Sequence, residues 1–162
     1  MIVYRDSVEG IGADQLRGGF FVGWPNPPSP DAHLRILAGS AAIGLAQEPD
    51  GPVVGFVTAI SDGVLSAYLP LLEVLPSYQH QGIGQELVRR VLVRLKDLYM
   101  VDLLCEPDLQ PFYEQLGMRR SFPLQAEILA RADQAGAKVR LPDAVDERAG
   151  RDRRFACHQP FR

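Results

Sequence analysis

The stretch that decides the fold runs from a strand end through a loop into a helix: Leu72-Glu73-Val74-Leu75-Pro76-Ser77-Tyr78-Gln79-His80-Gln81-Gly82-Ile83-Gly84-Gln85-Glu86-Leu87. Glycine fills two of the last three loop positions, Gly82 and Gly84, where the missing Cβ lets a ligand approach the backbone closely. The loop amides and the helix N-terminus carry partial positive charge at one point. The pattern therefore predicts an anion site suited to phosphate or pyrophosphate.

Two common phosphate motifs do not match this stretch. A P-loop requires lysine and then serine or threonine after its last glycine, but Gln85 and Glu86 follow Gly84. The dinucleotide fingerprint requires glycine or alanine at position 87, which is Leu87. The two glycines alone are equally compatible with an ordinary turn before a helix.

Upstream of the loop, three β-prone runs cover residues 41–47, 53–60 and 65–75. Asp-Gly turn signals separate them, which predicts an antiparallel meander. Pro70 lies inside the third run, and its missing N–H predicts a bulge or a splay there. Nearer the N-terminus we expect a strand at residues 2–4, a stiff proline loop at 24–30, and a short helix from Asp31, its cap, to Ala38.

Downstream of the loop, apolar side chains recur at helical spacing over residues 84–97. Residues 99–105 form an apolar run, interrupted by Asp102, that predicts a buried strand. Asp108 is then expected to cap a helix over residues 109–116, with Gly117 as its stop. Residues 1–130 therefore make one domain, and residues 131–162, with few large apolar side chains, are expected to be a peripheral or flexible tail.

Composition narrows the class of protein. The chain has 162 residues and a net charge of −3, which argues against a general nucleic-acid binder. No run approaches the roughly 18 apolar residues of a membrane span, and no signal peptide is recognised, so a cytoplasmic location without membrane attachment is expected. The two cysteines and three histidines show no zinc spacing, and we expect no metal.

The wider pattern around the loop is more specific than its glycines. Val74-x-Pro76-x-Tyr78-Gln79-x-Gln81-Gly82-Ile83-Gly84-x-x-Leu87 resembles the central motif of the GNAT superfamily of N-acetyltransferases. The second hallmark of that family is similar to Phe112-Tyr113-Glu114-Gln115-Leu116-Gly117-Met118. The resemblance covers residues 41–120. It implies an α/β fold with a central, mostly antiparallel twisted sheet of six to seven strands and helices on both faces.

The resemblance also implies acetyl-CoA as co-substrate. In the family the loop amides bind the CoA pyrophosphate, which here assigns Gln79, His80, Gln81, Gly82, Ile83, Gly84 and Gln85. The pantetheine arm lies where the preceding strand splays from its neighbour, at Val74 and Leu75. An amide near Val74 would polarise the thioester carbonyl.

For catalysis, the resemblance makes Tyr113 the acid that protonates the leaving thiolate. Glu73 and Asp102 are two candidates for the base, and a water relay is a third. The acceptor, a primary amine on a small molecule or a peptide, is expected to meet Phe21, Trp24 and Tyr68, although these side chains are equally compatible with core packing.

The sequence departs from the family pattern at two positions, and one alternative function stays open. The family often places an asparagine before the second helix, but Asn26 is the only asparagine in this chain, and Met118 stands where phenylalanine is common. The alternative function is a CoA-binding regulatory module without catalysis. Dimers are common in the family, so a homodimer is one expectation for the assembly.

Overall fold

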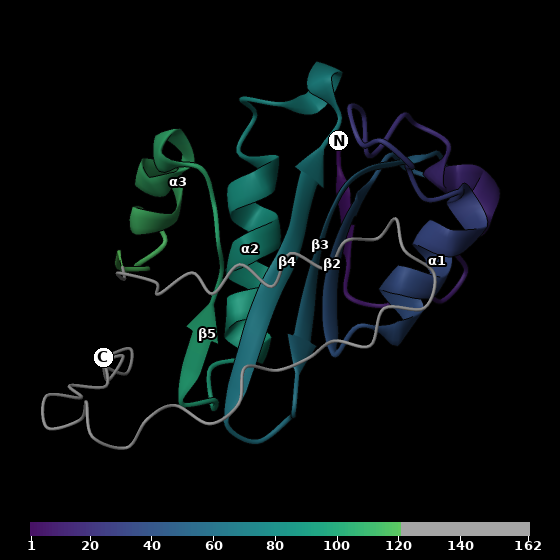
Figure 1. Cartoon of the computed structure of the whole chain (residues 1–162). Helices are drawn as coiled ribbons and strands as arrows, with labels where there is room; N and C mark the ends of the chain where they lie inside the picture. Colours follow the sequence, from purple (N-terminus) through teal and green to yellow (C-terminus); the bar gives the residue numbers. More distant parts are fainter. Residues whose placement is uncertain (121–162) are drawn as a thin grey trace, which may run out of the picture. The chain divides into compact units, whose positions relative to one another are not determined.

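The structure is a computed structural model, and it describes residues 1–120. The predicted domain boundary at residue 130 and the predicted tail lie outside the described residues. Within that part the element order follows a meander and then a crossover (Figure 1). Its strands are β1 (Val3–Arg5), β2 (Ala42–Gln47), β3 (Val53–Ser61), β4 (Ser66–Val74) and β5 (Met100–Asp102).

These strands form one sheet in the order β1-β2-β3-β4-β5. The first three pairings are antiparallel, and β4 and β5 pair in parallel because α2 (Ile83–Arg94) carries the chain across the sheet between them. The predicted mixed fold with a mostly antiparallel sheet is confirmed. The strand count is five within residues 1–120, lower than the six to seven that the family resemblance implied.

The two longer helices cover opposite faces of the sheet, as predicted. Leu87 of α2 lies over Gly44 and Gly55, where an added Cβ would approach its side chain to 3.3 Å. On the other face, the His33 ring of α1 (Pro30–Gly39) lies 4.3 Å from the Phe56 ring of β3. Because side chains alternate along a strand, the adjacent residues Gly55 and Phe56 must point to opposite faces. The core therefore has one layer on each side of the sheet.

The irregularity predicted at Pro70 is a β-bulge. Thr58 pairs with Leu71, and Ile60 pairs with Tyr68. Ala59 therefore faces two residues of β4, Leu69 and Pro70, instead of one. The missing N–H of Pro70 is accommodated at this interruption of the ladder.

Several boundaries differ from the sequence-based expectation. The helix expected over residues 84–97 runs from Ile83 to Arg94. Ser29, not Asp31, caps α1, because its hydroxyl accepts the Ala32 N–H at 3.2 Å and Pro30 fills the first helical position. The strand expected over 99–105 ends at Asp102, where the chain leaves β4.

The helix expected over 109–116 is instead a 3₁₀ turn, η3 (Pro107–Leu109), followed by α3 (Gln110–Glu114). Asp108 does not cap it, because no side-chain cap hydrogen bond is made at either element. Pro111 lacks the amide that a continuous helix needs here. Gly117 has φ 87° and ends the segment, as predicted. No helix within residues 1–120 is long and apolar enough to cross a membrane.

Candidate functional site

β4 has an open edge beside β5. The parallel ladder joins Ser66 to Met100, Ala67 to Val101 and Tyr68 to Asp102, and it stops there. On its other side β4 stays paired with β3 as far as Val74. Residues 69–74 of β4 therefore present one edge with no strand partner among the described residues, which is the splay that the family resemblance implied.

The ladder register determines which backbone groups point into this opening. The Leu75 N–H donates to the Val54 carbonyl at 2.8 Å, so Leu75 faces β3. Backbone groups alternate in direction along an antiparallel strand, so Leu72 and Val74 face the open edge. The Gln79 side-chain amide, which donates to the Val74 carbonyl at 2.9 Å, confirms that direction. The predicted position of Val74 thus fits a ligand contact, whereas the Leu75 amide is already paired within the sheet.

The loop after β4 exposes a group of unpaired amides. The short turn η2 (Pro76–Tyr78) leads to His80 and Gly82, whose φ angles are 60° and 79°. The first amide of α2 that bonds back to the loop is Glu86 N–H, which donates to the Gly82 carbonyl at 3.0 Å. The backbone N–H groups of Ile83, Gly84 and Gln85 donate to no acceptor within residues 1–120. Three orphan amides at a helix N-terminus form an anion site.

The two loop glycines have different roles. Gly82 has a positive φ that favours glycine, and no atom lies within 4 Å of where its Cβ would be, so its outer surface is open. A Cβ on Gly84 would instead lie 3.5 Å from the Phe112 ring of α3. Gly82 therefore shapes the loop and leaves room for a ligand, while Gly84 also brings α3 against the start of α2.

A hollow of about 320 Å³ lies between α2 and α3, beside the orphan amides. The Gln85 side chain bridges the two helices by donating to the Gln115 side-chain oxygen at 3.0 Å. Arg89 lines the hollow and pairs with Glu86, which also binds Arg90 at 2.6 Å. Neither Arg89 nor the side chain of Gln115 was predicted from the sequence as a residue of the site. The spacing of Glu86 from Arg89 and Arg90 was the available signal for this charged cluster.

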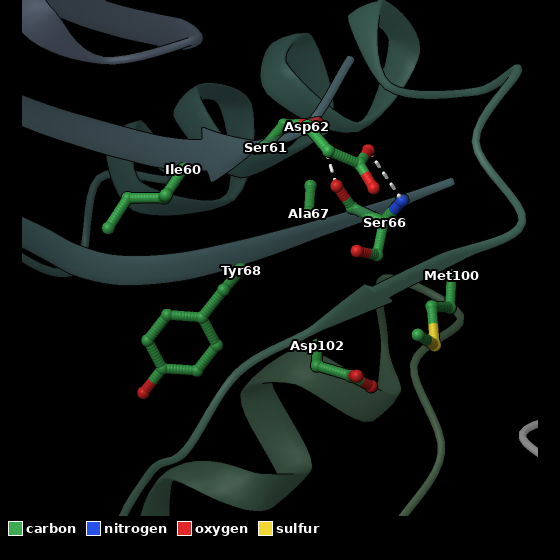
Figure 2. A pocket seen from close by; sticks show the side chains of 8 residues that line it. All are labelled: Ile60, Ser61, Asp62, Ser66, Ala67, Tyr68, Met100 and Asp102. Carbon is green, nitrogen blue, oxygen red and sulfur yellow. Dashed lines mark hydrogen bonds between the residues drawn. The ribbon is translucent and has the colours of Figure 1, made fainter. Parts of the chain in front are cut away.

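A second pocket, of about 260 Å³, lies along the paired residues of β4 and β5 and beside the β3–β4 turn (Figure 2). Tyr68 and Asp102, both predicted site residues, are register partners and line it together. Ile60 and Met100 provide apolar walls. The Asp62 carboxylate accepts the amides of Val64, Leu65 and Ser66, and these hydrogen bonds lower the pKa of Asp62. Asp62 therefore shapes the turn that closes one end of the pocket.

Glu73 lies on the same sheet face as α1, since its register partner is Phe56. Its two carboxylate oxygens accept the Phe21 N–H at 2.9 and 3.1 Å. Burial raises the pKa of Glu73, and the Phe21 hydrogen bond opposes part of that rise. The Phe21 N–H and the Glu73 carboxylate belong to residues that are 52 positions apart in the chain.

The predicted acceptor residues fall into two groups. The Phe21 ring is buried beside His33 and Phe56, and Trp24 packs edge-on against it at 5.4 Å while remaining 52% exposed. Tyr68 and Glu73 pair with Ile60 and Phe56, which are four residues apart on β3, so roughly 13 Å separates them at the usual rise of a strand. The structure thus places the Phe21 backbone on Glu73, with Trp24 against the Phe21 ring, and it pairs Tyr68 with Asp102.

Tyr113 lies on α3, with its ring 4.9 Å from the Phe112 ring in an edge-to-face arrangement. Burial, and then the nearby Cys105, raise the pKa of Tyr113 to about 12. The phenol is therefore protonated throughout the neutral range, as a proton donor must be.

Comparison with known proteins assigns a family to this geometry. The profile of the acetyltransferase (GNAT) family matches residues 13–118. A Deinococcus radiodurans R1 crystal structure assigned as an acetyltransferase is 52% identical, with a TM-score of 0.73, over 76% of this chain and 86% of that one. A GNAT family acetyltransferase from Streptococcus pneumoniae TIGR4 is 30% identical, with a TM-score of 0.57, over 88% of this chain and 100% of that one.

Among curated proteins, GCN5-related N-acetyltransferase 1, chloroplastic, of Arabidopsis thaliana is 29% identical over 116 residues, which are 70% of this chain and 59% of that protein. The chain spans between 30% and 59% of the length of the first curated relatives that it matches. The profile match covers well over half of the chain and includes both the loop and α3. The chain belongs to the GNAT family of acetyltransferases.

Proposed function

We propose that this protein transfers an acetyl group from acetyl-CoA to a primary amine, by direct attack of the amine in a ternary complex. The observation that carries the proposal is the continuity of two features. The open edge of β4 leads directly into a loop whose next three amides, at residues 83–85, are unpaired within residues 1–120. A ligand with a hydrogen-bonding arm and a pyrophosphate fits both at once.

The residues present fit such a ligand. The orphan amides of Ile83, Gly84 and Gln85 would bind the pyrophosphate, and the open surface at Gly82 would let it approach. The backbone groups of Leu72 and Val74 would pair with the amide-containing arm, once the Gln79 side chain leaves the Val74 carbonyl. Bound in this way, acetyl-CoA supplies an activated acyl carbon.

The chain must then move two protons. A carboxylate on the acceptor side takes a proton from the substrate ammonium, so that the neutral amine can form the new C–N bond as the C–S bond breaks. Tyr113 donates its phenolic proton to the departing sulfur, and the second proton that the amine nitrogen loses as the amide forms restores the phenol. Glu73 is our choice for the base, because its raised pKa lies nearer to neutral and it binds the N–H of Phe21, against whose ring the exposed Trp24 packs.

The first experiment is an acetyl-CoA titration by calorimetry. Gln85→Glu adds one negative charge at the anion site with almost no change in size, and Gln85→Met removes the amide without adding charge. We expect the wild type and Gln85→Met to bind acetyl-CoA, and Gln85→Glu to bind at least tenfold more weakly because the carboxylate repels phosphate. The proposal is wrong if the wild type does not bind.

Turnover is tested next with a panel of primary amines. Tyr113→Phe should lower kcat by about 10²-fold or more and leave acetyl-CoA binding unchanged, because the phenol acts only in proton transfer. Binding without turnover on any amine would instead support the CoA-binding regulatory module. We keep a cytoplasmic location, a homodimer and the absence of nucleic-acid and membrane partners as proposals.

A further inference from the structure

The loop that forms the anion site has an unfavourable backbone. His80 occupies the left-handed region at φ 60° although it has a side chain, and such positions are energetically unfavourable. The loop also brings several amides with partial positive charge together. A loop of this kind keeps its shape without a ligand only if other contacts hold it.

Two of its side-chain contacts are local. Gln79 donates to the Val74 carbonyl at 2.9 Å, and Gln81 donates to the Ser77 carbonyl at 3.1 Å. Ser77 belongs to the loop itself, so the Gln81 contact moves with the loop. Val74 ends β4, but its carbonyl is a group that the ligand arm would use, so the Gln79 contact is lost when the ligand binds and cannot hold the loop in its ligand-bound shape.

A third contact crosses to a different segment. The Tyr78 hydroxyl donates to a Glu48 carboxylate oxygen at 2.6 Å, across 30 residues of sequence. A short hydrogen bond to a carboxylate is among the stronger types in proteins. Tyr78 also packs against the core, so its ring is already placed for this bond.

Glu48 belongs to the β2–β3 connection, residues 48–52, which is firmly anchored. The Gly51 carbonyl accepts the side-chain amides of Gln47 at 2.8 Å and Gln15 at 3.2 Å. Gln47 is buried and its side-chain oxygen accepts the Arg5 Nε–H at 2.7 Å. The connection that carries Glu48 is therefore held to the sheet by these hydrogen bonds, close to the carboxylate that Tyr78 binds.

Gly51 also controls where that carboxylate lies. A Cβ at Gly51 would approach the Glu48 Cβ to 2.9 Å and a Glu48 carboxylate oxygen to 3.3 Å. Any larger residue at position 51 would therefore push Glu48 away from Tyr78. The close packing of Gly51 on Glu48 is an observation independent of the hydrogen bond itself.

We propose that Tyr78 and Glu48 form a brace that holds the cofactor loop in its ligand-binding shape, so that both are positioning residues for acetyl-CoA. The proposal rests on the proposed function, because it assigns the loop to that ligand. Holding the loop in advance reduces the ordering cost of binding. The brace is remote from the acyl carbon, so its loss should weaken binding and leave the chemical step unchanged.

The test compares calorimetric acetyl-CoA affinities of variants that keep the fold. Tyr78→Phe removes the hydroxyl and keeps the ring, Glu48→Leu removes the acceptor, and Glu48→Gln keeps an acceptor oxygen. We expect the first two to raise Kd about five- to tenfold, and Glu48→Gln to stay within about threefold of the wild type. The double variant Tyr78→Phe/Glu48→Leu should be no weaker than either single variant, because both remove one interaction.

Steady-state kinetics separates positioning from a general structural effect. The brace variants should raise KM for acetyl-CoA and change kcat by less than about twofold. Tyr4→Phe is the matched control, because it removes a phenolic hydroxyl from β1, where the Tyr4 ring contacts Arg90. The Kd of this variant for acetyl-CoA should equal that of the wild type. Wild-type affinity in Tyr78→Phe would overturn the brace and leave the proposed function standing. Failure of the wild type to bind would overturn both.

Discussion

His33 is a buried imidazole among the rings of Phe20, Phe21 and Phe56, and its Nε2 has no hydrogen-bond partner within the described residues. Burial lowers the pKa of His33 from 6.5 to about 4. The unfolded chain therefore binds a proton that the folded protein does not, between about pH 6.5 and pH 4. The titration of His33 therefore costs no stability above pH 6.5. As the pH falls from 6.5 to about 4, the free energy of unfolding decreases.

We predict that the free energy of unfolding attributable to His33 falls by about 2 kcal/mol from pH 7 to pH 5. His33→Leu should remove that part of the pH dependence, and should be neutral or stabilising at pH 7 because it replaces an unpartnered buried nitrogen. Urea unfolding of both proteins at the two pH values measures this. An unchanged pH dependence of stability in His33→Leu would contradict this assignment.

Glu73 and Asp102 can be distinguished by their effect on the rate. A base must be deprotonated, so kcat/KM should fall as the pH decreases through the raised pKa of Glu73. We predict that Glu73→Gln lowers kcat by about 10²-fold at pH 7 and abolishes this acid limb. Asp102→Asn should keep the limb. The opposite assignment follows if only Asp102→Asn removes it, and a water relay follows if both variants retain it.

At the scale of single residues, sequence reasoning found the loop because its chemistry is local and its spacing is fixed. It found Tyr68 and Asp102 separately, but their pairing depends on the β4–β5 register. The bond from Phe21 to Glu73 joins segments 52 residues apart, and no local pattern encodes it. Residues that act through tertiary contacts, such as Glu48, could not be found from spacing alone.

At the scale of elements, the contact of α2 with the sheet depends on two strand glycines. A Cβ at Gly44 would approach Val57 Cγ1 to 3.0 Å and Leu87 Cδ2 to 3.3 Å. Glycine is unfavourable inside a strand, so a strand pattern gives no reason for it. The structure supplies the reason: Leu87 of α2 occupies the space above Gly44 and Gly55.

We predict that Gly44→Ala lowers the free energy of unfolding by about 1–3 kcal/mol, because the added methyl overpacks this contact. Val57→Ala in the same chain should recover part of the loss, so that the double variant is more stable than additivity predicts. Gly39→Ala is the matched control, since nothing lies within 4 Å of its Cβ at the end of α1, and it should be neutral or stabilising. Chemical denaturation of the wild type, the two single variants, the double variant and the Gly39→Ala control provides the comparison, and strict additivity would contradict the packing argument.

Element boundaries were predictable where turn chemistry and periodicity agreed, as in the meander and at the start of α2. They were wrong where proline decided the outcome. Pro30 moved the start of α1 so that Ser29 became its cap, and Pro111 divided the segment after β5 into η3 and α3. The early end of β5 at Asp102 reflects the separation from β4, which is a property of the sheet and not of the apolar run.

At the scale of the whole described domain, the candidate site is extended along β4 and is not confined to one pocket. It begins at the β4–β5 separation beside Tyr68, follows the open edge past Val74, and ends at the orphan amides of α2 (Figure 1). A ligand along this site would contact β4, the loop and the α3 side together. Its binding should therefore slow amide exchange in several segments of the chain that are separate in sequence.

Hydrogen–deuterium exchange with and without acetyl-CoA tests this arrangement. We predict protection in peptides covering residues 72–85, because the amides of Leu72, Val74 and the start of α2 gain acceptors, and in peptides covering residues 103–117. Peptides from β1 and β2 should not change, since their amides are already paired in the sheet. Gln85→Glu at the same acetyl-CoA concentration serves as the control and should show little protection. Protection confined to the hollow beside Arg89, with none at residues 72–74, would mean that the ligand binds the helix N-terminus without entering the open edge, and the acyl group would then lie away from Glu73.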